Sequence, residues 1–345
     1  MAILYSKKKY ARFENIFYFL NILPFGIYAL INILLWIFEF SFESTNELVI
    51  GKALLLEKFG IFVNRIKFPL ANGINSYGTV VGGLLTISLV YLFVVKKNKL
   101  STMGIITVLI TTVLLTDSRG ALIYSFLILG AIWYYRSSKS FPAVFKIVPL
   151  MPILGSFLLI SVTQILSTTG LGAFLSRSSG DLESGNGRFL IWGYSLTEFI
   201  QFKIIQVIGY GDNGHVGSGV SNLWQNMFLT YGETTNMHPH NTTLAILFDI
   251  GYIGLAVYIY FLWRVLTIIQ KFWNINRNFS LVMLSFLLYT VLIGITESLY
   301  GFYYQNSIYF FFSIFAIAFV AETIYDRQQV KKGKSRDLIK ANWPN

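Results

Sequence analysis

Long apolar runs separated by short charged stretches are the feature of this sequence that most constrains its fold. Eight such runs follow one another, at residues 16–38, 74–95, 100–116, 120–135, 145–166, 242–263, 280–300 and 306–325. A helix needs roughly 17–25 apolar residues to cross a hydrocarbon core about 30 Å thick, and only the third and fourth runs are short. Charged residues make up 12% of the chain, against about 25% in soluble domains. The sequence therefore predicts an all-α integral membrane protein with about eight transmembrane helices.

The distribution of basic residues predicts the orientation of these helices. Nineteen of the 27 lysines and arginines fall in the stretches that eight spans would place on one side, namely 7–12, 96–99, 136–146, 264–277 and 327–340. By the positive-inside rule this side is cytoplasmic, so both termini are expected there. The net charge of +11 then follows from the topology and gives no support to a nucleic-acid partner. The absence of cysteine excludes disulfides and thiolate metal ligands.

The apolar runs divide the chain into four predicted regions. These are amino-terminal transmembrane helices (1–166), a large extracytoplasmic loop (167–241), carboxy-terminal transmembrane helices (242–325) and a basic cytoplasmic tail (326–345). Within the first region the first run is too long for a signal-peptide core, and no small-residue cleavage site follows it. Residues 48–72 alternate apolar and basic positions and are expected to form an interfacial amphipathic segment.

The predicted outer loop of about 75 residues is too long to be a simple connection. It is rich in Gly, Ser, Asn and Thr, and residues 188–202 place apolar side chains on one helical face, so short amphipathic helices are expected. Ser184 or Asn186 could cap that helix. The sequence has no internal repeat of the kind that many secondary transporters carry.

Two of the three histidines lie at the end of this loop, in Met237-His238-Pro239-His240-Asn241. Imidazole titrates near pH ~6.5, so a histidine there can exchange a proton at neutral pH. Pro239 restricts His238 to extended backbone, which predicts a linker rather than a helix. The pair is either a functional site or an accident of helix capping.

Two arginines are candidates for binding an anion at the same membrane surface. Arg119 lies where the third run ends and the fourth begins, and it could instead be a snorkelling side chain paired with Asp117. Arg188 begins the predicted loop helix and could instead be an ordinary surface residue. Paired arginines suit a diphosphate, because guanidinium groups bind phosphate oxygens bidentately. A nearby histidine suits general-base catalysis on a hydroxyl group.

Other polar residues have competing structural explanations. Asn72 and Asn75 begin the second run and could be helix caps. Asp249 lies two turns into the run that follows His240, where a buried carboxylate either supports the site or has a structural hydrogen-bonding role. Asp181 and Glu183 lie in a flexible Gly/Ser stretch that favours a solvated loop over a metal site.

Several short motifs together resemble the bacterial O-antigen ligase and O-antigen/capsule polysaccharide polymerase superfamily. They are Thr-Asp-Ser-Arg-Gly-Ala-Leu at 116–122, Arg188 followed by Ile191-Trp192, Gly-x-Gly at 209–211, and His-Asn-x-x-Leu-x-x-Leu-x-Asp-x-Gly-x-x-Gly-Leu at 240–255. The motifs occur in the right order over about residues 70–265, and Asn72-x-x-Asn75 is similar to a weaker element of the pattern. The chain departs from many relatives, which have ten to twelve spans.

The resemblance implies a GT-C-like membrane glycosyltransferase that needs no metal or other cofactor. Its donor would be an undecaprenyl-diphosphate-linked glycan on the extracytoplasmic face of the bacterial cytoplasmic membrane. Arg119 and Arg188 would hold the diphosphate, and His240 would be the base. The residues expected to bind substrate around them are Asn72, Asn75, Ser118, Trp192, Asn241 and Asp249.

The family contains both polymerases and ligases. The short chain and its abundance of Ile, Lys, Asn, Phe and Tyr, typical of a low-GC genome, favour polymerisation of lipid-linked repeat units into capsule, exopolysaccharide or O-antigen. The partners would be a glycan donor, a glycan acceptor and the bilayer, with a chain-length regulator and a flippase as further candidates. A ligase that transfers the glycan to another acceptor is the first alternative. A transporter or flippase for an anionic lipid-linked substrate is the second, and a structural subunit of an envelope complex is the third.

Overall fold

The computed structural model describes residues 13–40, 52–71, 73–167, 187–228, 238–299 and 305–342. Within these ranges the chain is helical, and its only β pairing is an isolated bridge between Lys52 and Asn64. The prediction of an all-helical chain is therefore confirmed for the described residues. Asn72, Ser184 and Asn186 lie outside them, as do Asp181 and Glu183.

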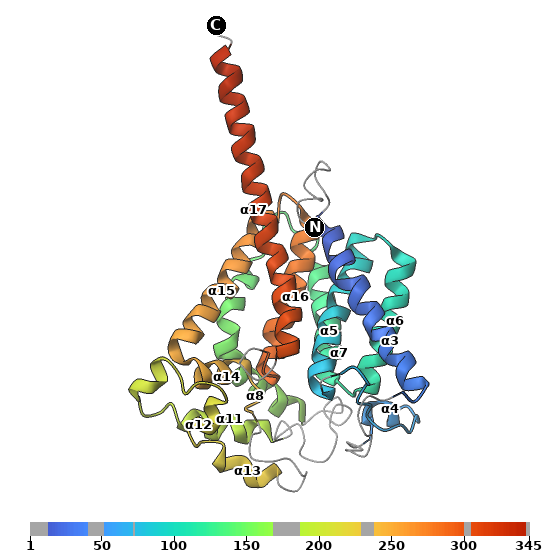
Figure 1. Cartoon of the computed structure of the whole chain (residues 1–345), viewed down its shortest axis with the longest axis vertical. Coiled ribbons are helices and arrows are strands. Elements are labelled where there is room, and N and C mark those ends of the chain that lie inside the picture. Colours follow the sequence, from blue (N-terminus) through green and yellow to red (C-terminus); the bar gives the residue numbers. More distant parts are fainter. Residues whose placement is uncertain are drawn as a thin grey trace.

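Long helices run roughly along one axis and form the body of the molecule (Figure 1). In chain order they are α2 (Phe13–Phe17) with the π-helical turn η1 (Tyr18–Ile22) and α3 (Leu23–Ile37), α5 (Ile74–Val90) with η2 (Tyr91–Val95), α6 (Lys99–Leu115), α7 (Arg119–Tyr135), η3 (Ala143–Leu150) with α8 (Met151–Ser167), α15 (Gly251–Phe272), α16 (Arg277–Thr296) and α17 (Gln305–Asn342). Short helices lie between them: α4 (Leu54–Glu57), α11 (Arg188–Thr197), η4 (Ile204–Val207), α12 (Gly214–Gly217), α13 (Asn222–Phe228) and α14 (Thr242–Asp249).

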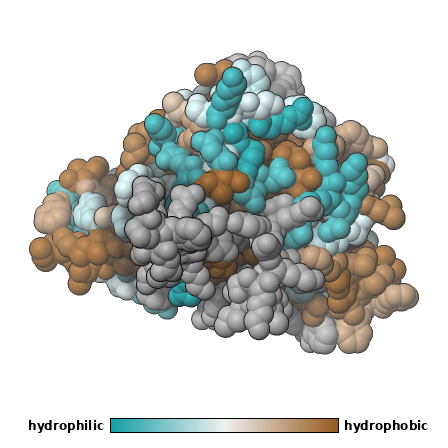
Figure 2. Space-filling model, turned by 90° about the horizontal axis from the view of Figure 1, so that it is seen from above, coloured by the Kyte–Doolittle hydropathy of each residue, from teal (hydrophilic) through white to brown (hydrophobic). Residues whose placement is uncertain are grey.

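The helices differ in how much of their apolar surface other helices cover. The α5–η2 and α16 helices form the centre of the molecule, and 78% and 83% of the residues in their most apolar stretches are buried. By contrast, the helix Asn15–Ile37, the η3–α8 helix and α15 bury only 28%, 28% and 39% of theirs. Figure 2 shows such apolar side chains gathered along the flanks of the molecule. Helices with this much exposed apolar surface are stable when lipid surrounds them, which supports a multi-pass membrane protein.

Five helices in the described residues are long and apolar enough to span a membrane. They are Asn15–Ile37, Ile74–Val95, Ala143–Ile165, Gly251–Phe272 and Arg277–Thr296, while α6 and α7 are shorter apolar helices. Six of these seven helices coincide closely with predicted apolar runs, and the seventh, Gly251–Phe272, is displaced from the predicted run 242–263. The total of eight spans and the GT-C-like arrangement stay predictions.

The exception is the predicted span 242–263, which is wrong. The helix breaks after Asp249, and the long helix α15 begins at Gly251 instead. Gly251 has φ +74°, and a side chain there would collide with the carbonyl oxygen of Gln206. The residues on both sides of this break are apolar, for different reasons. All eight residues of α14 are buried inside the protein, whereas α15 is one of the candidate membrane spans. Hydropathy alone therefore could not locate it.

The short helices gather at one end of the molecule, which we call the loop end (Figure 1). The described part of the predicted interfacial segment, residues 52–71, lies there as α4 and irregular chain. Its backbone is tied to the α6–α7 turn, because Ile66 N donates to Leu115 O at 3.0 Å and Leu55 N donates to Asp117 Oδ1 at 3.2 Å. The starts of α5 and α7 and the end of α16 meet at the same end.

Candidate functional site

The two histidines lie on irregular chain immediately before α14, as predicted. Asn241 is the N-cap of α14 and accepts a hydrogen bond from Leu244 N at 3.0 Å. His240, one residue earlier, has φ +47°, a left-handed conformation that is uncommon for non-glycine residues. The ring of His238 lies against the ring of His240, with centroids 4.1 Å apart.

Glu297, which follows α16, links His240 to Arg188. One carboxylate oxygen lies 3.3 Å from Nδ1 of His240, and the other accepts a 2.6 Å hydrogen bond from Nη2 of Arg188. The side chains are 13% (His240), 16% (Glu297) and 25% (Arg188) exposed. The three residues come from the loop before α14, the end of α16 and the start of α11. Together they form the structural centre of the site, which we call the His–Glu–Arg triad.

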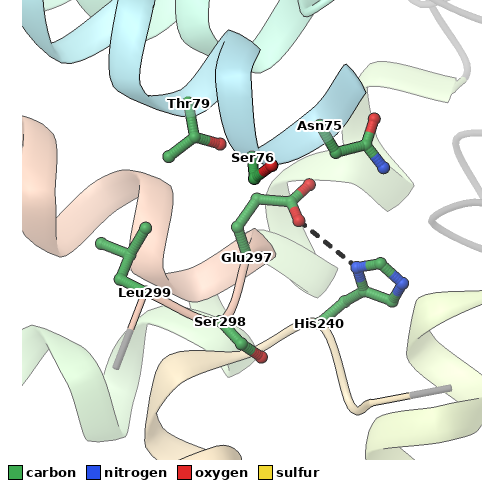
Figure 3. Close-up of a pocket in the computed structure, with 7 residues that line it drawn as sticks. All are labelled: Asn75, Ser76, Thr79, His240, Glu297, Ser298 and Leu299. Atoms are coloured by element: carbon green, nitrogen blue, oxygen red, sulfur yellow. Dashed lines mark hydrogen bonds and ion pairs between the residues drawn. The ribbon is translucent and has the colours of Figure 1, made fainter. Parts of the chain in front are cut away.

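The electrostatics of the triad favour an ionised carboxylate. Burial opposes the charge on Glu297, but the Arg188 guanidinium and the hydrogen bond with His240 outweigh it and lower the pKa of the carboxyl below its usual value. A carboxylate beside Nδ1 favours the tautomer in which Nδ1 carries the proton. Nε2 of His240 then keeps its lone pair, and Figure 3 shows this nitrogen on the side of the ring turned away from Glu297.

His238 holds the backbone on which His240 sits. Its Nδ1 accepts a hydrogen bond from His240 N at 3.1 Å and lies 3.1 Å from Ser298 Oγ, which in turn accepts from Asn241 N at 3.2 Å. An accepting Nδ1 carries no proton, so the serine hydroxyl donates to it. Burial, the largest cause, and the nearby positive charge of Arg188 lower the pKa of His238 well below its usual value and keep its ring neutral.

A small cavity opens beside the triad. Its walls come from the first turns of α5, the chain before α14 and the chain after α16. The lining residues are Asn75, Ser76, Thr79, His240, Glu297, Ser298 and Leu299 (Figure 3). The cavity holds about 40 Å³, room for a few water molecules and too little for a sugar ring. A glycan would therefore have to bind across its mouth. Asn75 at that mouth accepts a 3.0 Å hydrogen bond from Nη2 of Arg65.

The structure places Arg119 at the first position of α7, paired with Asp117. Its Nε lies 3.1 Å from Asp117 Oδ1 and its Nη2 3.4 Å from Oδ2, and only 9% of its side chain is exposed. This is the ion pair that the sequence left open as an alternative. Ser118 hydrogen-bonds Thr116 Oγ1 at 3.0 Å and lies against Gly78 of α5. Neither Arg119 nor Ser118 lines the cavity.

Three other candidates have structural contacts. Nε1 of Trp192 donates to Pro239 O at 2.9 Å, so the residue supports the histidine segment from α11. Nδ2 of Asn241 donates to Ser156 Oγ at 2.8 Å and to Ile295 O at 2.9 Å. Asp249 accepts from Gly214 N at 2.9 Å and thereby holds the loop against the end of α14. The carboxylate that contacts the ring of His240 belongs to Glu297, whereas the side chain of Asn241 bonds Ser156, Ile295 and Leu244.

Sequence reasoning missed Glu297 and Arg65. Glu297 falls inside the predicted run 280–300, where an acidic residue is costly and is usually paired, and this signal could have identified it. Arg65 is one of the basic residues of the predicted interfacial segment 48–72, and no local pattern indicates its contact with Asn75. Among the described residues, no three His, Cys, Asp or Glu side chains cluster as a metal site requires.

The comparisons with known proteins bear on the identity of the chain. No curated protein and no solved structure matches it. Residues 104–259, which include Arg119, α11 and the histidine segment, match the family described as O-antigen ligase. This match supports the assignment of the chain to the O-antigen ligase and polymerase family.

Proposed function

We propose that this chain is a membrane glycosyltransferase that polymerises undecaprenyl-diphosphate-linked oligosaccharide repeat units into a surface polysaccharide. The reaction would take place at the loop end, on the extracytoplasmic face of the bacterial cytoplasmic membrane. The observation that carries the proposal is the His–Glu–Arg triad, which joins a histidine base to an anion-binding arginine through Glu297. His240 and Arg188 lie in the region that matches the O-antigen ligase family, and Glu297 follows it in the chain.

His240 is the proposed general base. With Nδ1–H directed at Glu297, Nε2 can accept the proton of the acceptor hydroxyl, and the carboxylate then stabilises the imidazolium ion that forms. The buried ring of His238 and the 2.9 Å bond from Trp192 to Pro239 O limit the movement of the histidine backbone. A base held in this way can meet the acceptor at a defined angle.

Arg188 is the proposed diphosphate ligand nearest to the base. A guanidinium group has five N–H donors, so it can keep its bond to Glu297 while other N–H groups bind phosphate oxygens. Arg119 is retained as a second cation at the same end of the bundle. Because Arg119 is already paired with Asp117, it would act mainly through the electrostatic field of its positive charge, or by donating N–H groups to the substrate as well as to Asp117.

The reaction would be a single displacement. The acceptor oxygen forms a bond to the anomeric carbon, the bond from that carbon to the diphosphate oxygen breaks, and the hydroxyl proton passes to Nε2 of His240. Negative charge grows on the leaving diphosphate, where the arginines stabilise it. One displacement of this kind inverts the configuration of the anomeric carbon, and we propose no metal ion in it.

The ligase alternative has support of its own, since the matched family is described as O-antigen ligase. The two functions share donor and chemistry and differ in the acceptor, so the acceptor decides between them. We would incubate the purified full chain in lipid nanodiscs with a lipid-diphosphate-linked repeat unit and EDTA, and separate the products by size. A ladder of products supports polymerisation, and one transfer to an added second acceptor supports ligation. The absence of both would contradict the proposed chemistry.

His240→Ala is the first variant to include in this assay. If it inserts and folds normally but forms no product, the histidine is required for transfer. If it keeps full activity, His240 is not the base.

A further inference from the structure

The chain that follows α11 exposes an unusual amount of apolar surface. In residues 200–208, Ile200 is 78% exposed, Phe202 67%, Ile204 81% and Ile208 63%. Single exposed apolar side chains are common on proteins, but four large ones within nine residues concentrate apolar surface on one short segment, and such concentrations mark contact surfaces. We call this segment the apolar loop.

Hydrogen bonds hold the apolar loop in one shape. The Gln206 side chain donates to Glu198 O at 2.7 Å and to Gln201 O at 3.2 Å, and it accepts from Lys203 N at 3.1 Å. Gly209 N donates to Ile205 O at 2.8 Å. Gly251 allows the backbone of Gln206 to lie directly against the start of α15. The outward position of the apolar side chains is thus built into the fold.

The apolar patch continues onto α15, one of the five candidate membrane spans. Phe202 stacks on Tyr252 with ring centroids 6.4 Å apart and planes at 18°, and η4 packs against α15. Beyond Tyr252, α15 itself exposes Ile253 (52%) and Val257 (60%). These side chains belong to a helix that lipid is expected to surround. The apolar loop therefore extends a lipid-facing surface sideways at the point where the helix begins.

The charges beside the apolar loop suit the same environment. Lys203, the basic residue within it, pairs with Glu198 at 2.6 Å, and Tyr210 donates to the same carboxylate at 2.5 Å. Half of the Lys203 side chain is exposed, so the stem can lie along apolar surface while the ammonium group stays near water. Apolar side chains mixed with a lysine and tyrosines are typical of the membrane interface.

We propose that the apolar loop inserts into the boundary between head groups and acyl chains, so that the partner of this surface is membrane lipid. The insertion would anchor α11, which ends three residues before Ile200, to the membrane surface. It would thereby set how deep Arg188 and Trp192 lie relative to the lipid head groups. This inference stands independently of the proposed transferase function.

The natural absence of cysteine allows a direct test. Single variants Ile204→Cys, Asp212→Cys and Val257→Cys of the full chain are labelled with an environment-sensitive nitrobenzoxadiazole dye and reconstituted into phosphatidylcholine–phosphatidylglycerol vesicles. Quenching is measured with lipids spin-labelled near the glycerol backbone and with aqueous cobalt ions. Val257 on α15 reports insertion of the protein, and the exposed Asp212 is the matched loop position outside the apolar loop.

We expect the dye at position 204 to be quenched at least threefold more by spin-labelled lipid than the dye at 212, and to be protected from cobalt. Equal quenching of both positions by cobalt would overturn the proposal, provided that the dye at 257 is quenched by lipid. Protection of position 204 from both quenchers would also overturn it, because protein rather than lipid would then cover the apolar loop. None of these outcomes depends on transfer activity.

Discussion

Replacement of Glu297 by glutamine is the sharpest test of the triad. The carboxylate offers one oxygen to His240 and the other to Arg188, and glutamine keeps the shape but offers only one acceptor. If its NH2 group faces His240, it donates to Nδ1 and leaves the proton on Nε2, the nitrogen proposed to act as base. If the NH2 group faces Arg188, two donors oppose each other. Either arrangement removes one of two charge-assisted contacts.

The expected loss follows from these contacts. A hydrogen bond to a charged group contributes about 1.5–3 kcal/mol, and the stabilisation of the imidazolium ion is lost in addition. We therefore expect Glu297→Gln to raise the barrier to transfer by about 3–5 kcal/mol, which is a fall in kcat of roughly 10²–10⁴-fold. Glu297→Asp keeps both acceptors on a shorter stem and should lose about tenfold. Initial rates of transfer from the lipid-linked donor measure both.

A matched control is present elsewhere in the chain. Glu322 on α17 also links two cations, Arg264 at 2.9 Å and Lys271 at 3.4 Å, and its side chain is 18% exposed. Because it lies away from the histidines, Glu322→Gln should stay within about threefold of the unaltered rate even if stability falls. Glu297→Gln with more than a third of normal kcat and an unchanged melting curve would refute the role of the triad.

Three further substitutions test separate parts of the argument. Arg188→Lys replaces a planar group with several N–H groups by a single ammonium charge. It should lower kcat/KM for the lipid-linked glycan by about 10–100-fold, with much of the effect in KM. An unchanged KM would exclude a contact between Arg188 and that substrate. Gly251→Ala places a methyl group against the backbone of Gln206 at a residue with positive φ. It should lower the free energy of unfolding, measured by thermal denaturation, by about 1–3 kcal/mol or more. Gly130→Ala, whose methyl group meets open space, is the control and should change that free energy by less than about 1 kcal/mol. The pKa of His238 is lowered in the folded chain, so below pH 6.5, the ordinary pKa of histidine, the unfolded chain binds more protons than the folded chain. The free energy of unfolding should therefore decrease as the pH is lowered, by at most about 1.4 kcal/mol per pH unit. His238→Asn, which can still accept from His240 N, should flatten that dependence between pH 7 and 5, and equal slopes for both proteins would contradict it.

The sequence predicts the helices well because bilayer thickness imposes a length on every apolar run. The error at the predicted span 242–263 has a local cause. Eight residues of α14 are buried in protein and the next residues begin a separate helix, yet both are equally apolar. What separates them is the left-handed backbone at Gly251 and the close approach of residues 206–209, which hydropathy does not report.

The site is less predictable, because its contacts join segments far apart in the chain. His240 and Glu297 are 57 positions apart, and Arg188 and Glu297 are 109 apart. Position along the chain and short motifs identified the histidine and both arginines as candidates. They could not show that Arg119 pairs with its neighbour Asp117 while Arg188 reaches across to a residue that follows another helix.

The motif that begins at His240 contains residues of two kinds. Asn241 caps α14 and bonds α8 and α16, Asp249 holds Gly214, and Gly251 admits the backbone of Gln206. These residues fold the loop end, and only His240 turns its ring toward the cavity. The spacing of the motif is therefore explained by one buried helix of eight residues that must be fastened at both ends. It follows that loss of activity on changing Asp249 would not identify a substrate ligand unless folding of the loop is measured separately.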